Sequence, residues 1–114
     1  MADLVTVLET WRDQVERRIH VWGQWDCLLA PADYALALTG ADPAAGYRGR
    51  YVDERGARRI LREAGGMAAL AAATLEPLGW RPTTSPPSGA LGVVRLALPG
   101  GRLSRHTFGA VMYG

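Results

Sequence analysis

The spacing of apolar residues changes once along the chain, and that change limits the folds it can form. From Leu4 to about Gly79, several segments repeat apolar residues every three or four positions, as amphipathic helices do. Two strand-like segments follow, at 91–98 and 103–113, and the turn sequence Pro99-Gly100-Gly101-Arg102 joins them. The sequence therefore predicts an α+β fold with N-terminal helices packed on a C-terminal antiparallel hairpin or small sheet.

Start and stop signals divide the N-terminal part into four expected helices, at about 4–19, 27–38, 54–64 and 67–78. Aspartates that can accept hydrogen bonds from free backbone N–H groups precede three of them: Asp3, Asp26 and Asp53. The second helix is expected to be the buried central one, because Asp33 is its only charge. An irregular first turn is expected in it, because Pro31 removes a hydrogen bond.

The first helix is expected to bury one continuous apolar stripe. Its members recur at helical spacing: Leu4, Leu8, Trp11, Val15 and Ile19. On the opposite, wet side Asp13 precedes Arg17 by four residues, which is the favourable order for an ion pair.

Length and composition bound the class of protein. A chain of 114 residues, 48% hydrophobic and 21% charged, is expected to form a single globular domain spanning 1–114. One cysteine excludes an internal disulfide and a cysteine-based zinc site, and the two histidines lack metal-ligand spacing, so no metal or cofactor is expected. The most apolar run, 67–75, is too short for a membrane span, and no signal peptide is apparent.

Every basic residue is an arginine, yet the formal net charge is only +2. Six arginines fall between Arg48 and Arg62, with Asp53 and Glu54 among them. A helix of this kind is more often a solvated or interface surface than a nucleic-acid site, so nucleic acid is the weakest of the partners considered. Tyr47 and Tyr51 bracket part of this run, and their loop either binds a partner or is pinned to its own domain.

The single cysteine, Cys27, follows Asp26 at the expected start of the second helix. The helix dipole favours negative charge there and lowers the pKa of a thiol, which makes Cys27 a candidate nucleophile. A thiolate needs a base, and the candidate is His106, which shares one face of the second strand with Phe108 and Ala110. The plainer interpretation is that Cys27 is a small buried apolar residue, as most free cysteines are.

A series of short motifs runs from Trp22 to about Gly79. They read Trp22-Gly23-Gln24-Trp25-Asp26-Cys27, Ala32-Asp33, Thr39-Gly40-Ala41-Asp42-Pro43, Arg48-Gly49-Arg50-Tyr51 and Gly56-Ala57-Arg58-Arg59-Ile60-Leu61. This series, with a histidine on a later strand, resembles the NlpC-type, papain-like cysteine peptidases of cell walls. It is more similar still to a group of small phage tail proteins related to those peptidases.

The resemblance implies a reduced papain-like core in a protein of the phage tail tip, made in the host cytoplasm and carried in the virion. Carried over by position, Cys27 would be the nucleophile, its backbone N–H would help to hold the oxyanion, and His106 would act as base and then acid. Trp22 and Trp25 flank the cysteine, and they either line a substrate cleft or serve core and rim packing.

Two functions from different classes follow. The first is a cysteine peptidase or amidase that cleaves an amide of peptidoglycan during host entry. The second is a catalytically inactive structural or assembly protein of the tail tip or baseplate, with other tail proteins as its partners. A small arginine-rich nucleic-acid binder is a third, weaker option.

Overall fold

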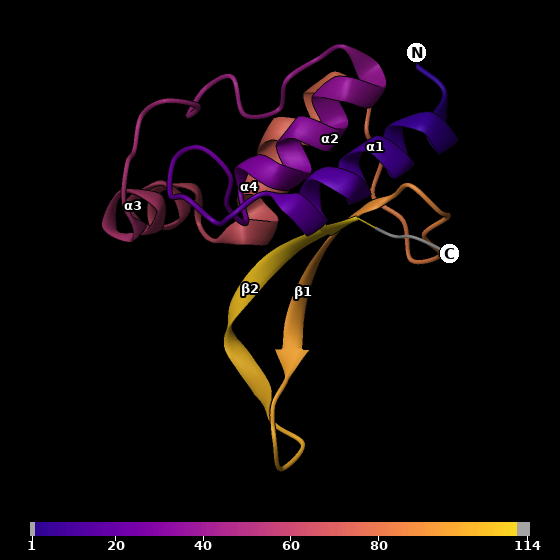
Figure 1. The fold of residues 1–114 in the computed structure, drawn as a ribbon. Coiled ribbons are helices and arrows are strands. Elements are labelled where there is room, and N and C mark those ends of the chain that lie inside the picture. The colour runs from indigo at the N-terminus through magenta and orange to yellow at the C-terminus, as the bar shows by residue number, and fades with distance from the viewer. Residues whose placement is uncertain (1, 112–114) are drawn as a thin grey trace.

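Four helices and a two-stranded hairpin make up the described part of the chain (Figure 1). The structure, a computed structural model, describes residues 2–111; it does not describe the side chains of Leu96 and of 104–111. Its elements are α1 (Leu4–Arg17), α2 (Leu29–Thr39), α3 (Glu54–Ala64), α4 (Met67–Leu75), the short 3-10 helix η1 (Glu76–Leu78), β1 (Leu91–Ala97) and β2 (Leu103–Val111). This order confirms the predicted α+β class.

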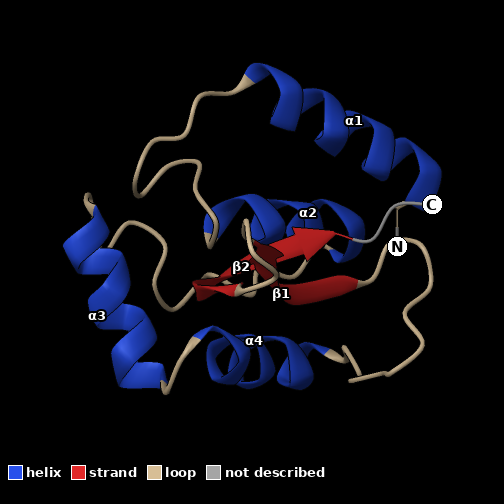
Figure 2. Ribbon diagram, turned by 90° about the horizontal axis from the view of Figure 1, so that it is seen from below, coloured by secondary structure: helices blue, strands red, loops and turns tan. Residues whose placement is uncertain are grey.

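The hairpin extends away from the helices, and its base lies between α2 and α4 (Figures 1 and 2). In the view along the hairpin, α1 lies outside α2, and α3 lies beyond the end of α4 (Figure 2). β1 and β2 are antiparallel, with Leu91 opposite Val111 and Val93 opposite Gly109, and the register is irregular between Arg95 and Ala97. Within residues 2–111, no helix has both the length and the hydrophobicity needed to cross a bilayer.

The first helix is shorter than predicted, and its apolar stripe is only partly buried. Asp3 caps it as expected, accepting a hydrogen bond from the Thr6 N–H at 3.0 Å. Leu8 is buried, but Val15 is 43% exposed and Ile19 is 82% exposed. The prediction for Ile19 was wrong because the chain leaves the helix at Arg18, whose backbone is extended.

Helix α2 begins at Leu29, two residues later than predicted, so Cys27 lies in the preceding turn. The expected irregularity at Pro31 accounts for this. The Ala30 N–H still donates to the Asp26 carbonyl at 2.9 Å, but Pro31 has no N–H to offer the Cys27 carbonyl. The helix ends as predicted at Gly40, where φ is +79°.

Helix α2 is the central helix, as predicted from its lack of charge. Its buried residues are Leu29, Ala32, Tyr34, Ala35 and Leu38. Leu29 and Ala32 belong to one core cluster, together with Tyr47, Tyr51, Met67 and Leu70 among others, and Val93 of the hairpin packs against it. Tyr34 and Leu38 form a second cluster with Leu8 of α1. Helix α2 thus connects the two halves of the interior.

The two later helices follow the sequence signals closely. Asp53 caps α3 by accepting from the Gly56 N–H at 2.8 Å, and Ala57 is buried as expected. The fourth helix was predicted to continue to residue 78, but α4 ends at Leu75 and a 3-10 turn replaces its last part. Pro77 explains the change, because it cannot donate the hydrogen bond that would continue an α-helix.

Candidate functional site at Cys27

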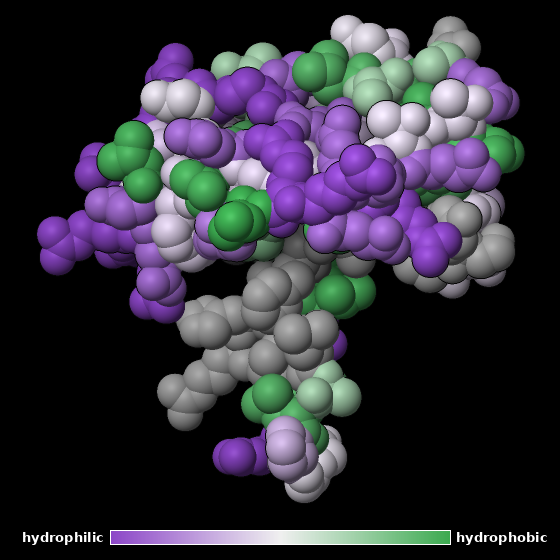
Figure 3. All heavy atoms as spheres, viewed as in Figure 1, coloured by the Kyte–Doolittle hydropathy of each residue, from purple (hydrophilic) through white to green (hydrophobic). Residues whose placement is uncertain are grey.

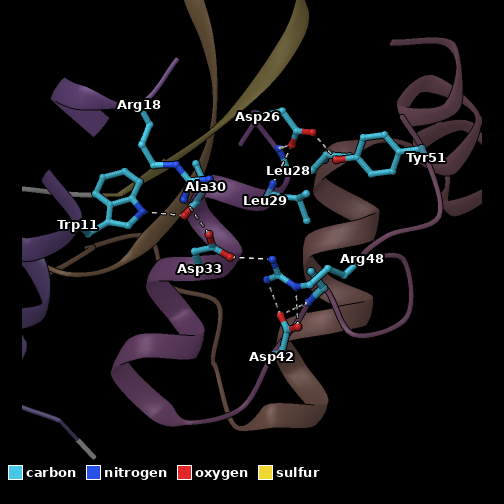
Figure 4. A network of polar contacts seen from close by, with 11 residues as sticks. Trp11, Arg18, Asp26, Leu28, Leu29, Ala30, Asp33, Asp42, Arg48 and Tyr51 are labelled. Atoms are coloured by element: carbon cyan, nitrogen blue, oxygen red, sulfur yellow. Dashed lines mark hydrogen bonds and ion pairs between the residues drawn. The ribbon is translucent and has the colours of Figure 1, made fainter. Parts of the chain in front are cut away.

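Asp26 is the best-connected polar residue near the cysteine. It is 2% exposed, and its carboxylate accepts four hydrogen bonds, of which Figure 4 shows those from Leu28, Leu29 and Tyr51. Three come from backbone N–H groups at 2.9 Å, those of Gly23, Leu28 and Leu29. The fourth comes from the Tyr51 hydroxyl at 2.5 Å. The carboxylate therefore fixes the 22–25 turn, the start of α2 and the loop that leads to α3.

A second carboxylate network holds the loop between α2 and α3. Arg48 donates two hydrogen bonds to Asp42, at 2.9 and 3.0 Å, and its third nitrogen lies 2.8 Å from Asp33 of α2 (Figure 4). The hydrogen bond from Arg48 lowers the pKa of Asp42 below its ordinary value. A bidentate arginine–carboxylate pair of this kind fixes geometry as well as charge, so the loop is pinned to α2.

Two motif glycines allow the backbone to approach Tyr51. Gly23 has φ of +82°, and a Cβ there would lie 2.3 Å from the Tyr51 carbonyl oxygen. At Gly56 an added Cβ would lie 2.6 Å from the Tyr51 Cβ. The two glycines therefore let the 22–25 turn and α3 close on the Tyr51 loop from two sides.

The loop that carries Tyr47 and Tyr51 was expected either to bind a partner or to be pinned to its own domain. Their side chains are 9% and 5% exposed, so the loop is pinned to its own domain. Tyr51 belongs to the motif Arg48-Gly49-Arg50-Tyr51, but nothing in the sequence indicated that its hydroxyl donates a hydrogen bond to Asp26. No signal at all pointed to Tyr47 as a neighbour of Cys27.

Cys27 is half-buried and lines an apolar cavity of about 140 Å³. The cavity lies between the start of α2, helix α4 and strand β1, with Leu70, Leu91 and Val93 on its walls. Burial raises the pKa of the Cys27 thiol above its ordinary value, and the neighbouring Asp26 carboxylate raises it further. A helix-start position alone would predict the opposite direction.

His106 lies on β2, but its side chain is outside the described side chains, so its distance from the Cys27 sulfur is not described. The role of His106 as a base stays a prediction.

The two tryptophans that flank the motif lie in packed surroundings. Trp25 is 6% exposed, and the Arg18 guanidinium lies 4.3 Å from the centre of its ring. Trp22 is half-buried and meets the ring of His20 edge-on at 4.6 Å. Neither tryptophan is among the described residues that line the cavity at Cys27. Their role in substrate binding stays a prediction.

Carboxylates, histidines and the cysteine do not gather into a potential metal site anywhere in the described part of the chain. Cys27 and Tyr47 both line the apolar cavity.

The fold and the site define an α+β protein with a cysteine in the turn that precedes its central helix. More particularly, the chain belongs to the family described as "Domain of unknown function (DUF6950)", which matches residues 1–100. No curated protein and no solved structure is significantly similar to the chain.

Proposed function

We propose that this chain is a component of a phage tail tip, built on a reduced NlpC-like fold. The proposal is supported by the motif series that begins at Trp22 and by the arrangement of the central helix, with Cys27 in the turn before it, against an antiparallel hairpin. Its partners in this role are other tail proteins.

Of the two forms of this function, the geometry favours the structural or assembly form. The observation that carries it is the use made of the polar motif residues. Five polar side chains of the motifs form hydrogen bonds or ion pairs with other parts of the chain: Asp26, Asp33, Asp42, Arg48 and Tyr51. The motif series therefore serves to close the Tyr51 loop on α2, and the thiol beside it has a raised pKa.

The test is made in the phage whose genome encodes the chain. A structural component is expected in purified virions, and its deletion should abolish infective particles. The Cys27→Ala variant should restore the titre to the wild-type level, because the thiol is not needed for assembly. Absence of the chain from virions would refute the tail role. Failure of Cys27→Ala to restore the titre, with normal particles formed, would instead support catalysis.

A cysteine peptidase or amidase is the second candidate, and one observation favours it. Cys27 is only half-buried, lines a cavity and lies in the turn two residues before α2, where its own backbone N–H can help to hold an oxyanion. The purified chain would be incubated with peptidoglycan and the soluble fragments measured, with Cys27→Ser and His106→Ala as matched variants. Release that both variants abolish would establish the enzyme, and no release from the wild type would exclude it for that substrate.

A further inference from the structure

One residue that lines the cavity beside Cys27, Tyr47, has a hydroxyl that makes no hydrogen bond within the described part of the chain. Tyr47 is 9% exposed. Two other buried tyrosines do have partners: Tyr34 donates to the Gly89 carbonyl at 2.7 Å, and Tyr51 donates to Asp26. Trp80 Nε1 is the one fully buried side-chain polar atom without a partner in the described part of the chain. The Tyr47 hydroxyl therefore keeps some accessible surface, and it is available to a ligand.

Tyr47 and Cys27 line the same cavity. Burial raises the pKa of Tyr47 to about 12, and the charge of the Asp42 carboxylate contributes to the rise. The hydroxyl is therefore protonated in ordinary conditions and offers a hydrogen-bond donor.

A second hydroxyl on the cavity wall can only accept. Thr74 of α4 donates its proton to the Leu70 carbonyl at 2.8 Å, which leaves the lone pairs of its oxygen. The wall thus presents one donor, at Tyr47, and one acceptor, at Thr74. A carboxamide has the matching groups, because its carbonyl oxygen accepts and its N–H donates.

The rest of the wall sets the charge and size of the ligand. None of the described side chains that line the cavity is charged, so a charged ligand would lose its hydration without gaining a partner. The volume of about 140 Å³ is similar to that of an engineered apolar cavity of about 150 Å³ that binds benzene. The space therefore suits an alkyl group of about the size of a leucine side chain.

We infer that the cavity between α2, α4 and β1 binds a neutral aliphatic amide, whose carbonyl accepts a hydrogen bond from Tyr47 and whose alkyl group packs on Leu70, Leu75 and Leu91. The inference goes beyond the proposed function, because binding requires neither turnover nor assembly. If binding fails while the virion results hold, the proposed function stands unchanged.

Isovaleramide is the probe, since it joins an isobutyl group to a carboxamide. In an NMR titration of the full chain we expect saturable shifts with a dissociation constant in the millimolar range, as for other ligands of this size. Isovalerate has the same shape with a charge, and acetamide has the amide without the alkyl group, so both should bind far more weakly. Equal binding of isovalerate, or no saturation by isovaleramide, would overturn the inference.

Matched variants distinguish the contribution of the Tyr47 hydroxyl to isovaleramide binding from that of cavity packing. Tyr47→Phe removes the free hydroxyl and should weaken isovaleramide binding about fivefold to tenfold. Tyr34→Phe removes a hydroxyl that already has a partner and should leave binding unchanged. Ala71→Leu, on the α4 wall, should fill the space and abolish binding. Equal weakening by the two tyrosine variants, or unchanged binding in Ala71→Leu, would contradict the assignment.

The single cysteine gives an independent readout. Because Cys27 lines the cavity, bound isovaleramide should slow its alkylation by iodoacetamide. N-acetyl-leucinamide carries the same alkyl group as a peptide side chain. It therefore tests whether the natural ligand is part of a peptide or a free small amide. Protection by it as well points to a peptide side chain, and protection by isovaleramide alone points to a free small amide. Protection by neither would refute the site.

Discussion

The Tyr51 hydroxyl lies 2.5 Å from Oδ2 of Asp26, and this contact joins residues 25 positions apart. It brings the loop before α3 onto the turn before α2, where Cys27 is held. Burial, and then the hydrogen bond to Asp26, raises the pKa of Tyr51 well above its usual value, so the phenol stays a donor. The position of the thiol therefore depends on a tyrosine that does not line the cavity.

Replacing Tyr51 by phenylalanine should destabilise the fold. The change removes one donor from a buried carboxylate, and hydrogen bonds to charged groups contribute about 1.5–3 kcal/mol. Tyr47→Phe is the matched control, because its hydroxyl has no partner among the described residues, and its unfolding free energy should change by less than about 0.5 kcal/mol. Urea denaturation followed by circular dichroism measures both. Equal losses would show that the Asp26 contact contributes nothing specific.

Gly23 and Gly49 offer a second matched pair. Both have positive φ, +82° and +79°, but only at Gly23 would a Cβ meet backbone, the Tyr51 carbonyl oxygen at 2.3 Å. Gly49→Ala should cost about 1 kcal/mol from strain alone. Gly23→Ala should cost at least about 2 kcal/mol more, since the turn and the Tyr51 loop must separate. Thermal unfolding of the two variants tests this, and similar melting temperatures would contradict the close approach.

Local signals in the sequence were enough to predict that four helices form and where α1 and α3 begin. Asp3 and Asp53 accept hydrogen bonds from the N–H groups three residues on, and Gly40 adopts the left-handed conformation that ends α2. The predictions were wrong where burial depends on packing against residues distant in the sequence. Ile19 has helical spacing yet is exposed, because the chain turns away at Arg18 and leaves that position without a partner surface.

The site was less predictable than the fold. The sequence placed Cys27 at a helix start and implied a lowered thiol pKa, whereas burial and Asp26 raise it. Which residues surround the sulfur depends on α4 and β1, which are distant in sequence, so the cavity and the role of Tyr47 could not be predicted from local patterns.

Acid should destabilise the chain partly through Asp42. Its folded pKa lies below the value of 3.8 of the free group, so its contribution is fully present above that pH and is lost as pH falls through the folded pKa. Arg48→Gln removes the cause and should flatten the loss of unfolding free energy between about pH 5 and about pH 2. Arg17→Gln breaks an exposed pair with Asp13 and should leave the profile unchanged. Parallel profiles for wild type and Arg48→Gln would contradict this.

The pH dependence of Cys27 alkylation distinguishes a structural thiol from a catalytic one. The pKa of the thiol is raised above 9.0, first by burial and then by Asp26, so the thiolate fraction is small at neutral pH. The rate of reaction with iodoacetamide should therefore keep rising through about pH 9, and unfolding in urea should increase it at a fixed pH near 8.

A thiol paired with a base would behave in the opposite way, because an imidazolium stabilises the thiolate and gives a rate plateau near neutral pH. His106→Ala identifies that base: it should leave the alkylation profile unchanged if the thiol is structural, and should remove the plateau if His106 is its partner. A neutral plateau that His106→Ala abolishes would overturn the structural form and establish the pairing that β2 is predicted to supply. A steady rise in both proteins would leave the thiol with no role as a nucleophile at physiological pH.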